Sequence, residues 1–288
     1  MKQKKSGGVM TAVVIIAFLA GLSLLLYPTL SSYWNTMRQA QSISAYDEEV
    51  GRLRREEYDR LRRAAEEYNR ALLDRPSRFA LTEELAQQYP EMLLTGGSDV
   101  MAYLEIPVLD LTLPIRHGVE KDTLQRSVGH LEWSSLPVGG ESTHCVLSGH
   151  RGLPSSELLT NIDRLEEGDL FYLHVLGETL KYRVDRFAVV EPDDFSLLGI
   201  EEGEDYVTLL TCTPYGINSH RLLVRGVRVQ EGTEGSAGTA AVNNELRLLD
   251  TRFVLALILA PALALAFILL LCGRNTKKRE ERGEDEKP

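Results

Sequence analysis

The chain has 288 residues, with 42 acidic against 32 basic side chains and a formal net charge of −10. This length allows one well-packed domain with appendages. The acidic balance argues against a nucleic-acid-binding protein, for which a basic stripe is expected. Three cysteines, Cys145, Cys212 and Cys272, are too few for a disulfide framework. No motif indicates a metal site or implies a cofactor.

An apolar run without charged residues occupies residues 9–30, directly after a basic N-terminus. It is long enough to cross roughly 30 Å of hydrocarbon. We predict a transmembrane signal-anchor here, preceded by a cytoplasmic tail of residues 1–8. A cleaved signal peptide is the alternative, but the length of the run and the lack of a small-x-small site after it argue against cleavage.

A second apolar run covers residues 253–272 and is followed by a basic cluster within residues 273–288. Pro261 inside it is tolerated in a membrane span, and a buried core helix is the alternative. Basic residues flank the outer end of each run, so both termini are predicted to be cytoplasmic. The part between the spans is then extracellular, and residues 231–252 form its linker to the second span.

Residues 31–99 are predicted to hold a juxtamembrane helix and a lid-like loop. Between residues 41 and 74, apolar side chains recur at spacings of mostly three or four, which predicts an amphipathic helix. A coiled-coil dimer is the alternative, although its apolar positions are few and rich in tyrosine. Residues 74–99 contain proline and glycine and are predicted to be a long surface loop, a type of segment that often forms lids.

From residue 100 to residue 230 the pattern changes to short β-rich runs bounded by turn residues. Gly177-Glu178 is predicted to join two of these runs in a tight hairpin, and short helices are expected at 121–127 and 155–165. Seven or eight strands in this length predict a closed β-barrel or a sandwich. The fold class is therefore mainly β, with peripheral helices.

Cys212 ends an apparent buried strand, and Arg221 opens the next one nine residues later. If these strands pair as a hairpin, the two Cβ atoms lie about 5 Å apart. A guanidinium in that position favours thiolate over thiol and can hold a developing oxyanion. The alternative is that Cys212 is simply a small buried hydrophobic residue.

His150 lies in Ser-Gly-His-Arg-Gly, where a β-rich run meets glycines, so its ring can project from a strand end into a cleft. The other histidines lie within strands or near turns and are interpreted as structural, and His220 alternates to the face opposite Arg221. Cys145 alternates away from His144 and is predicted to be in the core. His150 is therefore the candidate general base or acid.

Three segments in the same order resemble the sortase family. Thr208-Leu-Leu-Thr-Cys212 with Arg221 downstream is similar to the sortase TLxTC signature, and Leu147-Ser-Gly-His150 is similar to the sortase histidine segment. The run 129–140 and the second apolar run resemble class C sortases, the pilin polymerases. The resemblance covers residues 100–229 and implies a closed sortase-type β-barrel of about eight strands.

The resemblance also implies a catalytic mechanism and a cellular location. Cys212 would attack the Thr–Gly carbonyl of an LPXTG-like sorting signal and form an acyl-thioester, His150 would act as general acid and base, and Arg221 would stabilise the oxyanion. The acceptor in class C enzymes is a pilin lysine amine, and aminolysis requires that the amine is held close while water is excluded. The catalytic domain would lie outside a Gram-positive cell membrane.

The sequence departs from class C sortases in the lid, which in that class carries an Asp-Pro-aromatic anchor. Here residues 74–79 read Asp-Arg-Pro-Ser-Arg-Phe, so the dipeptide is interrupted. Asp74 pairing with Arg221 and Phe79 covering Cys212 remain candidate lid contacts, and an ordinary linker is the alternative. Two other functions stay open, namely attachment of proteins to a cell-wall peptide amine and a non-catalytic membrane-tethered scaffold.

Overall fold

The computed structural model describes residues 6–75, 77–229 and Leu263. The chain divides into two compact units, one made of Met1–Ser31 with Ala237–Pro288 and the other of Ser32–Ser236. The predicted linker 231–252, almost all of the predicted second span 253–272, and the tail 273–288 lie outside the described residues.

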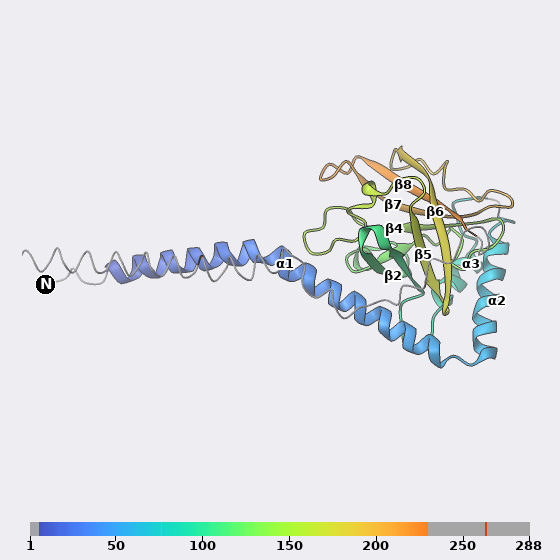
Figure 1. Cartoon of the computed structure of the whole chain (residues 1–288), viewed down its shortest axis with the longest axis horizontal. Helices are drawn as coiled ribbons and strands as arrows, with labels where there is room; N and C mark the ends of the chain where they lie inside the picture. Colours follow the sequence, from blue (N-terminus) through green and yellow to red (C-terminus); the bar gives the residue numbers. More distant parts are fainter. Residues whose placement is uncertain (1–5, 76, 230–262, 264–288) are drawn as a thin grey trace, which may run out of the picture. The chain divides into compact units, whose positions relative to one another are not determined.

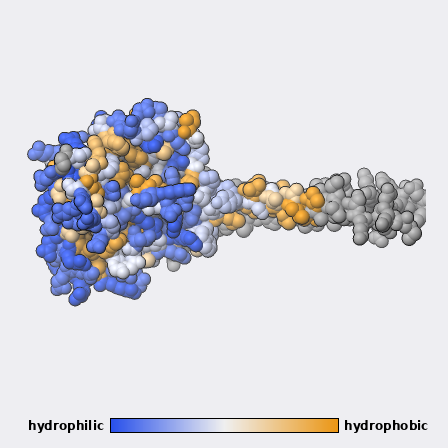
Figure 2. All heavy atoms as spheres, turned by 180° about the vertical axis from the view of Figure 1, so that it is seen from behind, coloured by the Kyte–Doolittle hydropathy of each residue, from blue (hydrophilic) through white to orange (hydrophobic). Residues whose placement is uncertain are grey.

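Helix α1 (Ser6–Arg52) continues without interruption from the apolar run into the charged segment that follows it (Figure 1). Among the described residues, it is the one helix long and apolar enough to cross a membrane, a test that a signal sequence would also pass. Figure 2 shows hydrophobic side chains gathered on the described part of this apolar run.

The predicted helix over 41–74 is present as two helices. Helix α1 ends at Arg52, the extended backbone of Arg54 breaks the chain direction, and α2 (Arg55–Ala71) follows. The apolar face of the pattern is the buried one, as predicted; its buried members are Tyr46, Leu61, Ala65, Tyr68 and Leu72. The loop after α2 contains α3 (Glu83–Gln88) and a 3-10 turn, η1 (Tyr89–Glu91).

Eight strands form a closed barrel in the order β1-β2-β3-β4-β7-β8-β6-β5 (Figure 1). The strands are β1 (Ala102–Ile106), β2 (Leu111–His117), β3 (Val128–His130), β4 (Thr143–Ser148), β5 (Leu170–Val175), β6 (Glu178–Val190), β7 (Asp205–Thr213) and β8 (His220–Arg228). Short helical turns lie between them: η2 (Pro107–Leu109), α4 (Lys121–Leu124) and η3 (Ile162–Arg164). The prediction of a mainly β barrel is confirmed.

Alternation of side chains explains how the strands divide between core and surface. Strands β1 and β5 bury every second residue, because one face meets the barrel interior and the other meets solvent or α1. Strand β4 is buried along nearly its whole length. It pairs in parallel with β7, and a parallel pair covered on both faces is typically apolar throughout.

Three local predictions need correction. The β5–β6 turn consists of Leu176 and Gly177, both with positive φ, so it lies one residue before the predicted Gly177-Glu178. The helix expected over 121–127 is the single turn α4, and the helix expected over 155–165 is reduced to η3.

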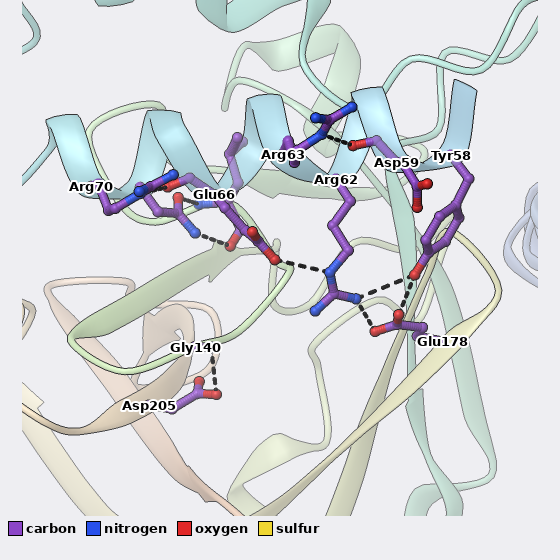
Figure 3. A network of polar contacts seen from close by, with 11 residues as sticks. Tyr58, Asp59, Arg62, Arg63, Glu66, Arg70, Gly140, Glu178 and Asp205 are labelled. Carbon is purple, nitrogen blue, oxygen red and sulfur yellow. Dashed lines mark hydrogen bonds and ion pairs between the residues drawn. The ribbon is translucent and has the colours of Figure 1, made fainter. Parts of the chain in front are cut away.

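A polar network fastens α2 to the β5–β6 hairpin (Figure 3). The hydroxyl of Tyr58 and the guanidinium of Arg62 both donate to the carboxylate of Glu178, and Arg62 Nε donates to Glu66 at 2.9 Å. The neighbouring guanidinium and hydroxyl hold the pKa of Glu178 below its usual range, although its burial acts in the opposite direction. This contact keeps the helical segment against the barrel.

Candidate active site

The strand register places Cys212 and Arg221 directly opposite each other. Strands β7 and β8 are antiparallel, and their pairing includes Thr211 with Leu222 and Cys212 with Arg221. The predicted hairpin is therefore confirmed, and the thiol lies at the open end of a strand whose preceding residues are buried. Such a position combines a rigid backbone with partial access to solvent.

His150 is brought to the same end by the parallel pairing of β4 with β7. The last paired residues are Ser148 and Leu210. The contact continues beyond the strand, because Gly149 N donates to Leu210 O at 3.0 Å and Thr211 Oγ1 donates to Gly149 O at 2.7 Å. The same offset carried two residues beyond the Ser148–Leu210 pair would set His150 level with Cys212. Three strands thus bring the three predicted residues to one edge of the barrel.

The guanidinium of Arg221 is bonded to backbone carbonyl groups rather than to a carboxylate. Arg221 Nη1 donates to the carbonyl oxygens of Asn218 and His220 at 3.3 and 3.1 Å. No carboxylate among the described residues forms an ion pair with Arg221, so its positive charge is free to act on the neighbouring sulfur or on a bound oxyanion. Partial burial lowers the pKa of His150, which favours the neutral imidazole near pH 7.

An apolar cavity of about 130 Å³ lies beside Arg221, which is the one of these three residues that lines it. One side of the cavity is lined by Leu210 of β7 and by Arg221 and Leu223 of β8. Its wall comes from the β6–β7 loop, which contributes Phe195 and Leu198 among other residues. The charged members of this mostly apolar lining are Arg221 and Asp194. Such a cavity suits an extended apolar peptide that ends at a carbonyl polarised by the guanidinium.

The β6–β7 loop is held in place by His144, which was predicted to be structural. Its Nδ1 donates to Gly199 O at 2.9 Å, and Thr208 Oγ1 lies 2.7 Å from its Nε2. Burial lowers the pKa of His144, which fits a neutral ring with both nitrogens bonded. The residues of this loop that line the cavity were not identified from the sequence, because nothing in the pattern shows which loop folds over which strand.

The candidate lid residues are found in different places from those expected. Asp74 is exposed, and it forms no ion pair with Arg221 in the part of the chain that the structure describes. Phe79 instead packs edge-on against Trp133, with ring centroids 5.2 Å apart, and against Phe195 at 5.5 Å. The Asp74–Arg221 contact is therefore wrong for this structure, since Asp74 points to solvent. Pro76 lies outside the described residues.

Cys145 is in the core, as predicted. It is 3% exposed on β4, and burial raises the pKa of its thiol well above the usual range. Within the described residues, no group of three or more His, Cys, Asp or Glu side chains is arranged to hold a metal ion. Arg151 is a residue that sequence reasoning passed over. Its Nη1 donates to Thr213 Oγ1 at 3.1 Å, and its Nη2 lies 2.5 Å from Asp163.

A closed eight-stranded barrel with cysteine, histidine and arginine at one edge is typical of a class of cysteine enzymes. Comparison of the chain with known proteins identifies the family. The Sortase domain model matches residues 104–229. Sortase D of Bacillus subtilis is 32% identical over 129 residues, which cover 44% of this chain and 62% of the relative. The match therefore spans less than two thirds of that relative's length.

Solved structures extend the similarity beyond the barrel. Sortase C1 of Streptococcus agalactiae is 43% identical with a TM-score of 0.64, and the match covers 67% of this chain and 100% of that chain. Sortase C of Clostridium perfringens, solved with the C-terminal cell wall sorting motif, is 45% identical with a TM-score of 0.59, covering 66% and 99%. The chain belongs to the sortase family of cysteine transpeptidases, and its structural neighbours at 41–45% identity are class C sortases.

Proposed function

We propose that this chain is a membrane-anchored transpeptidase that cleaves an LPXTG-like sorting signal between Thr and Gly and transfers the acyl group to a pilin lysine. The observation that carries the proposal is the pairing of Cys212 with Arg221 across β7 and β8, with the His150 segment alongside. A nucleophile, a base and an unpaired cation on one strand edge are the parts that acyl transfer requires.

In the first step, the Cys212 thiol transfers its proton to His150, and the resulting thiolate attacks the carbonyl carbon of the Thr–Gly bond. Negative charge develops on the carbonyl oxygen, and the Arg221 guanidinium stabilises it. The C–N bond then breaks, and protonated His150 gives its proton to the departing glycine amine. The products are an acyl-thioester on Cys212, a free amine and a neutral His150.

In the second step, a lysine amine attacks the thioester carbon while neutral His150 accepts a proton from it. The C–S bond breaks, the thiolate is regenerated, and an isopeptide bond joins the two proteins. The lowered pKa of His150 suits this step, because the ring is then mostly unprotonated before the amine arrives. Transfer to lysine exceeds hydrolysis only if the amine is held near the thioester and water is kept out.

The apolar cavity supports a donor with apolar residues before the scissile bond. Leu210, Leu223 and Leu198 offer contact to the leucine and proline of such a motif, and Arg221 lies at the end where the carbonyl would be. The Clostridium perfringens neighbour was solved with its C-terminal cell wall sorting motif, which is the same class of ligand.

Residues 74–99 are proposed to act as a lid through Phe79 rather than through Asp74. Phe79 packs on Phe195, and Phe195 also lines the cavity. Movement of this loop would change one wall of the donor site without touching Cys212. The anchor is proposed to be the apolar run of α1 together with the predicted span 253–272, with both termini cytoplasmic and the barrel outside.

The test uses the purified full chain, an LPXTG peptide and intact-protein mass spectrometry. A mass gain equal to the acyl fragment, absent from Cys212→Ala, supports the thioester mechanism. Adding a pilin lysine peptide or a cell-wall peptide amine then shows which acceptor releases the acyl group faster. If several donor peptides leave the wild-type mass unchanged, the transpeptidase proposal fails and a scaffold is favoured.

A further inference from the structure

The covered face of the second half of α1 carries several polar side chains besides the buried Ile43. Asn35, Gln39, Ser42 and Tyr46 follow one another at spacings of four, three and four, which places them on one side of the helix. A docked helix usually presents apolar side chains on such a face. Here Arg116 Nη2 donates to Ser42 Oγ at 3.2 Å, and Tyr46 OH donates to Met101 O at 3.2 Å.

Asn35 and Gln39 each form a hydrogen bond with the segment that follows His150. Asn35 Nδ2 donates to Ser155 O at 2.8 Å. Gln39 Nε2 donates to Arg126 O at 2.9 Å and to Ser156 Oγ at 3.3 Å. Gln39 is 7% and Ser156 is 4% exposed, so this contact is shielded from water. Buried amides are retained where each donor finds an acceptor, which makes the contact specific in position.

The bonded segment in turn supports the backbone around His150. Leu159 packs so closely under Gly149 that a Cβ at Gly149 would lie 2.7 Å from Leu159 Cγ. Gly152 N donates to Thr160 Oγ1 at 3.1 Å, which closes the loop on itself. The residues immediately before and after the His150–Arg151 pair therefore rest on a segment that α1 fastens.

The opposite side of the same loop is fastened to the strand that carries the nucleophile. Arg151, whose side chain is only 10% exposed, donates to Thr213 Oγ1 and pairs with Asp163. Thr213 directly follows Cys212. The His150 loop is thus held at one side by the end of β7 and at the other side by the juxtamembrane part of α1.

From this arrangement we infer that Asn35 and Gln39 are positioning residues for His150, so that the helix leaving the membrane anchor sets the geometry of proton transfer at Cys212. The inference rests on the proposed function, because it assigns His150 a role in that reaction. It goes further by making the juxtamembrane helix a part of the catalytic machinery rather than a tether. Small displacements of a catalytic group are expected to lower the rate of the chemical step more than substrate binding.

The experiment compares full-length wild type with Asn35→Asp and Gln39→Leu, each of which removes a donor while keeping a similar size. Gln41→Leu is the matched control, because Gln41 is exposed on the same helix. The kcat and KM of acyl transfer from an LPXTG peptide are measured in detergent. We expect kcat to fall about tenfold in the two variants, KM to stay within about twofold, and the control to match wild type.

A second readout does not depend on substrate. The rate of Cys212 alkylation is measured against pH for wild type, Asn35→Asp, Gln39→Leu and His150→Ala. The expected result is that the profiles of the two helix variants shift from the wild-type profile toward that of His150→Ala. Thermal midpoints are recorded for each variant so that a loss of fold is recognised.

The outcomes separate the two proposals. If the variants lose stability while their alkylation profile and kcat remain those of wild type, α1 only stabilises the barrel and the inference is overturned. If wild type forms no acyl-enzyme, the proposed function fails, and the alkylation profiles alone then decide whether α1 positions His150. Unchanged profiles in Asn35→Asp and Gln39→Leu overturn the inference in that case as well.

Discussion

The two described cysteines lie on neighbouring parallel strands and have opposite surroundings. Cys145 is paired with Val207 in the middle of β4 and β7, where the barrel core encloses it. Burial raises the pKa of its thiol well above the usual range. Cys212 lies five residues further along β7, at the strand end, partly exposed and opposite Arg221.

The comparison shows that position along a strand, rather than residue type, separates a structural thiol from a reactive one. In the strand interior, both faces of β4 and β7 are covered, so a charged sulfur would lose its hydration without gaining a partner. At the strand end, solvent and a cation are both available.

The largest expected loss of acyl-transfer rate follows removal of the nucleophile. Cys212→Ala should lower the rate of acyl transfer by about 10⁴-fold or more, because no thioester can form. Cys145→Ala should keep wild-type turnover and lose roughly 1 kcal/mol of unfolding free energy. Turnover is measured with a donor peptide and unfolding with urea. Activity retained by Cys212→Ala and lost by Cys145→Ala would reverse the two assignments.

The second-largest expected loss of rate follows removal of the cation at the strand edge, Arg221. Arg221→Ala should reduce the rate by about 10²–10³-fold with little change in thermal midpoint, because one stabilising donor for the oxyanion is removed. Arg183→Ala is the control, since Arg183 is an exposed arginine on the neighbouring strand β6. Steady-state kinetics of both variants measure the effect. Equal rates for the two variants would remove Arg221 from the mechanism.

The interior has its own titratable group in His130, buried next to Tyr89. The Tyr89 hydroxyl lies 3.0 Å from Nδ1, and Nε2 donates to Ser135 O at 2.9 Å. Burial lowers the pKa of His130 to about 4. Since this folded pKa lies below the unfolded value, the unfolded state binds more protons between them. The stability contribution is therefore complete above about pH 6.5 and is lost as the pH falls toward 4.

We expect protonation of His130 to lower the free energy of unfolding by up to about 3 kcal/mol as the pH falls. Urea unfolding at pH 7.5 and at pH 4.5 measures it, with His130→Asn as the comparison. The variant is expected to be less stable at pH 7.5 but to depend less on pH. A pH dependence as steep as that of wild type would assign the effect to other groups, such as His117 and His144, whose pKa values are also lowered by burial.

The smallest effect is expected at the surface network in Figure 3. Glu178→Gln removes the charge that Arg62 and Tyr58 contact, but the carboxylate is partly exposed and screened by solvent. We expect a loss of about 0.2–1 kcal/mol in unfolding free energy that shrinks at high salt, and no change in turnover. Glu204→Gln, at an exposed carboxylate, serves as the control. A fall in turnover would mean that α2 contributes to the active site.

Several parts of the fold could be predicted because they depend on local pattern. Period-two runs identified seven of the eight strands, and the spacing of Cys212 and Arg221 was sufficient to predict their pairing across a hairpin. Strand β3 was missed because three residues are too short for a pattern. The break at Arg54 was not predicted, although Gly51 lies three residues before it, because a single glycine is tolerated within a helical pattern.

The sequence by itself determined the β-rich composition of the barrel, the apolar run of α1 and the candidate residues Cys212, His150 and Arg221. These follow from side-chain alternation and from chemistry that is local to each segment. Only the tertiary structure decided that β4 lies beside β7, that Phe79 packs on Trp133 and Phe195, and that Asn35 and Gln39 reach the loop after His150. Such contacts join segments up to about 120 residues apart, and they are selected by packing and hydrogen bonding over the whole barrel rather than by neighbours in the chain.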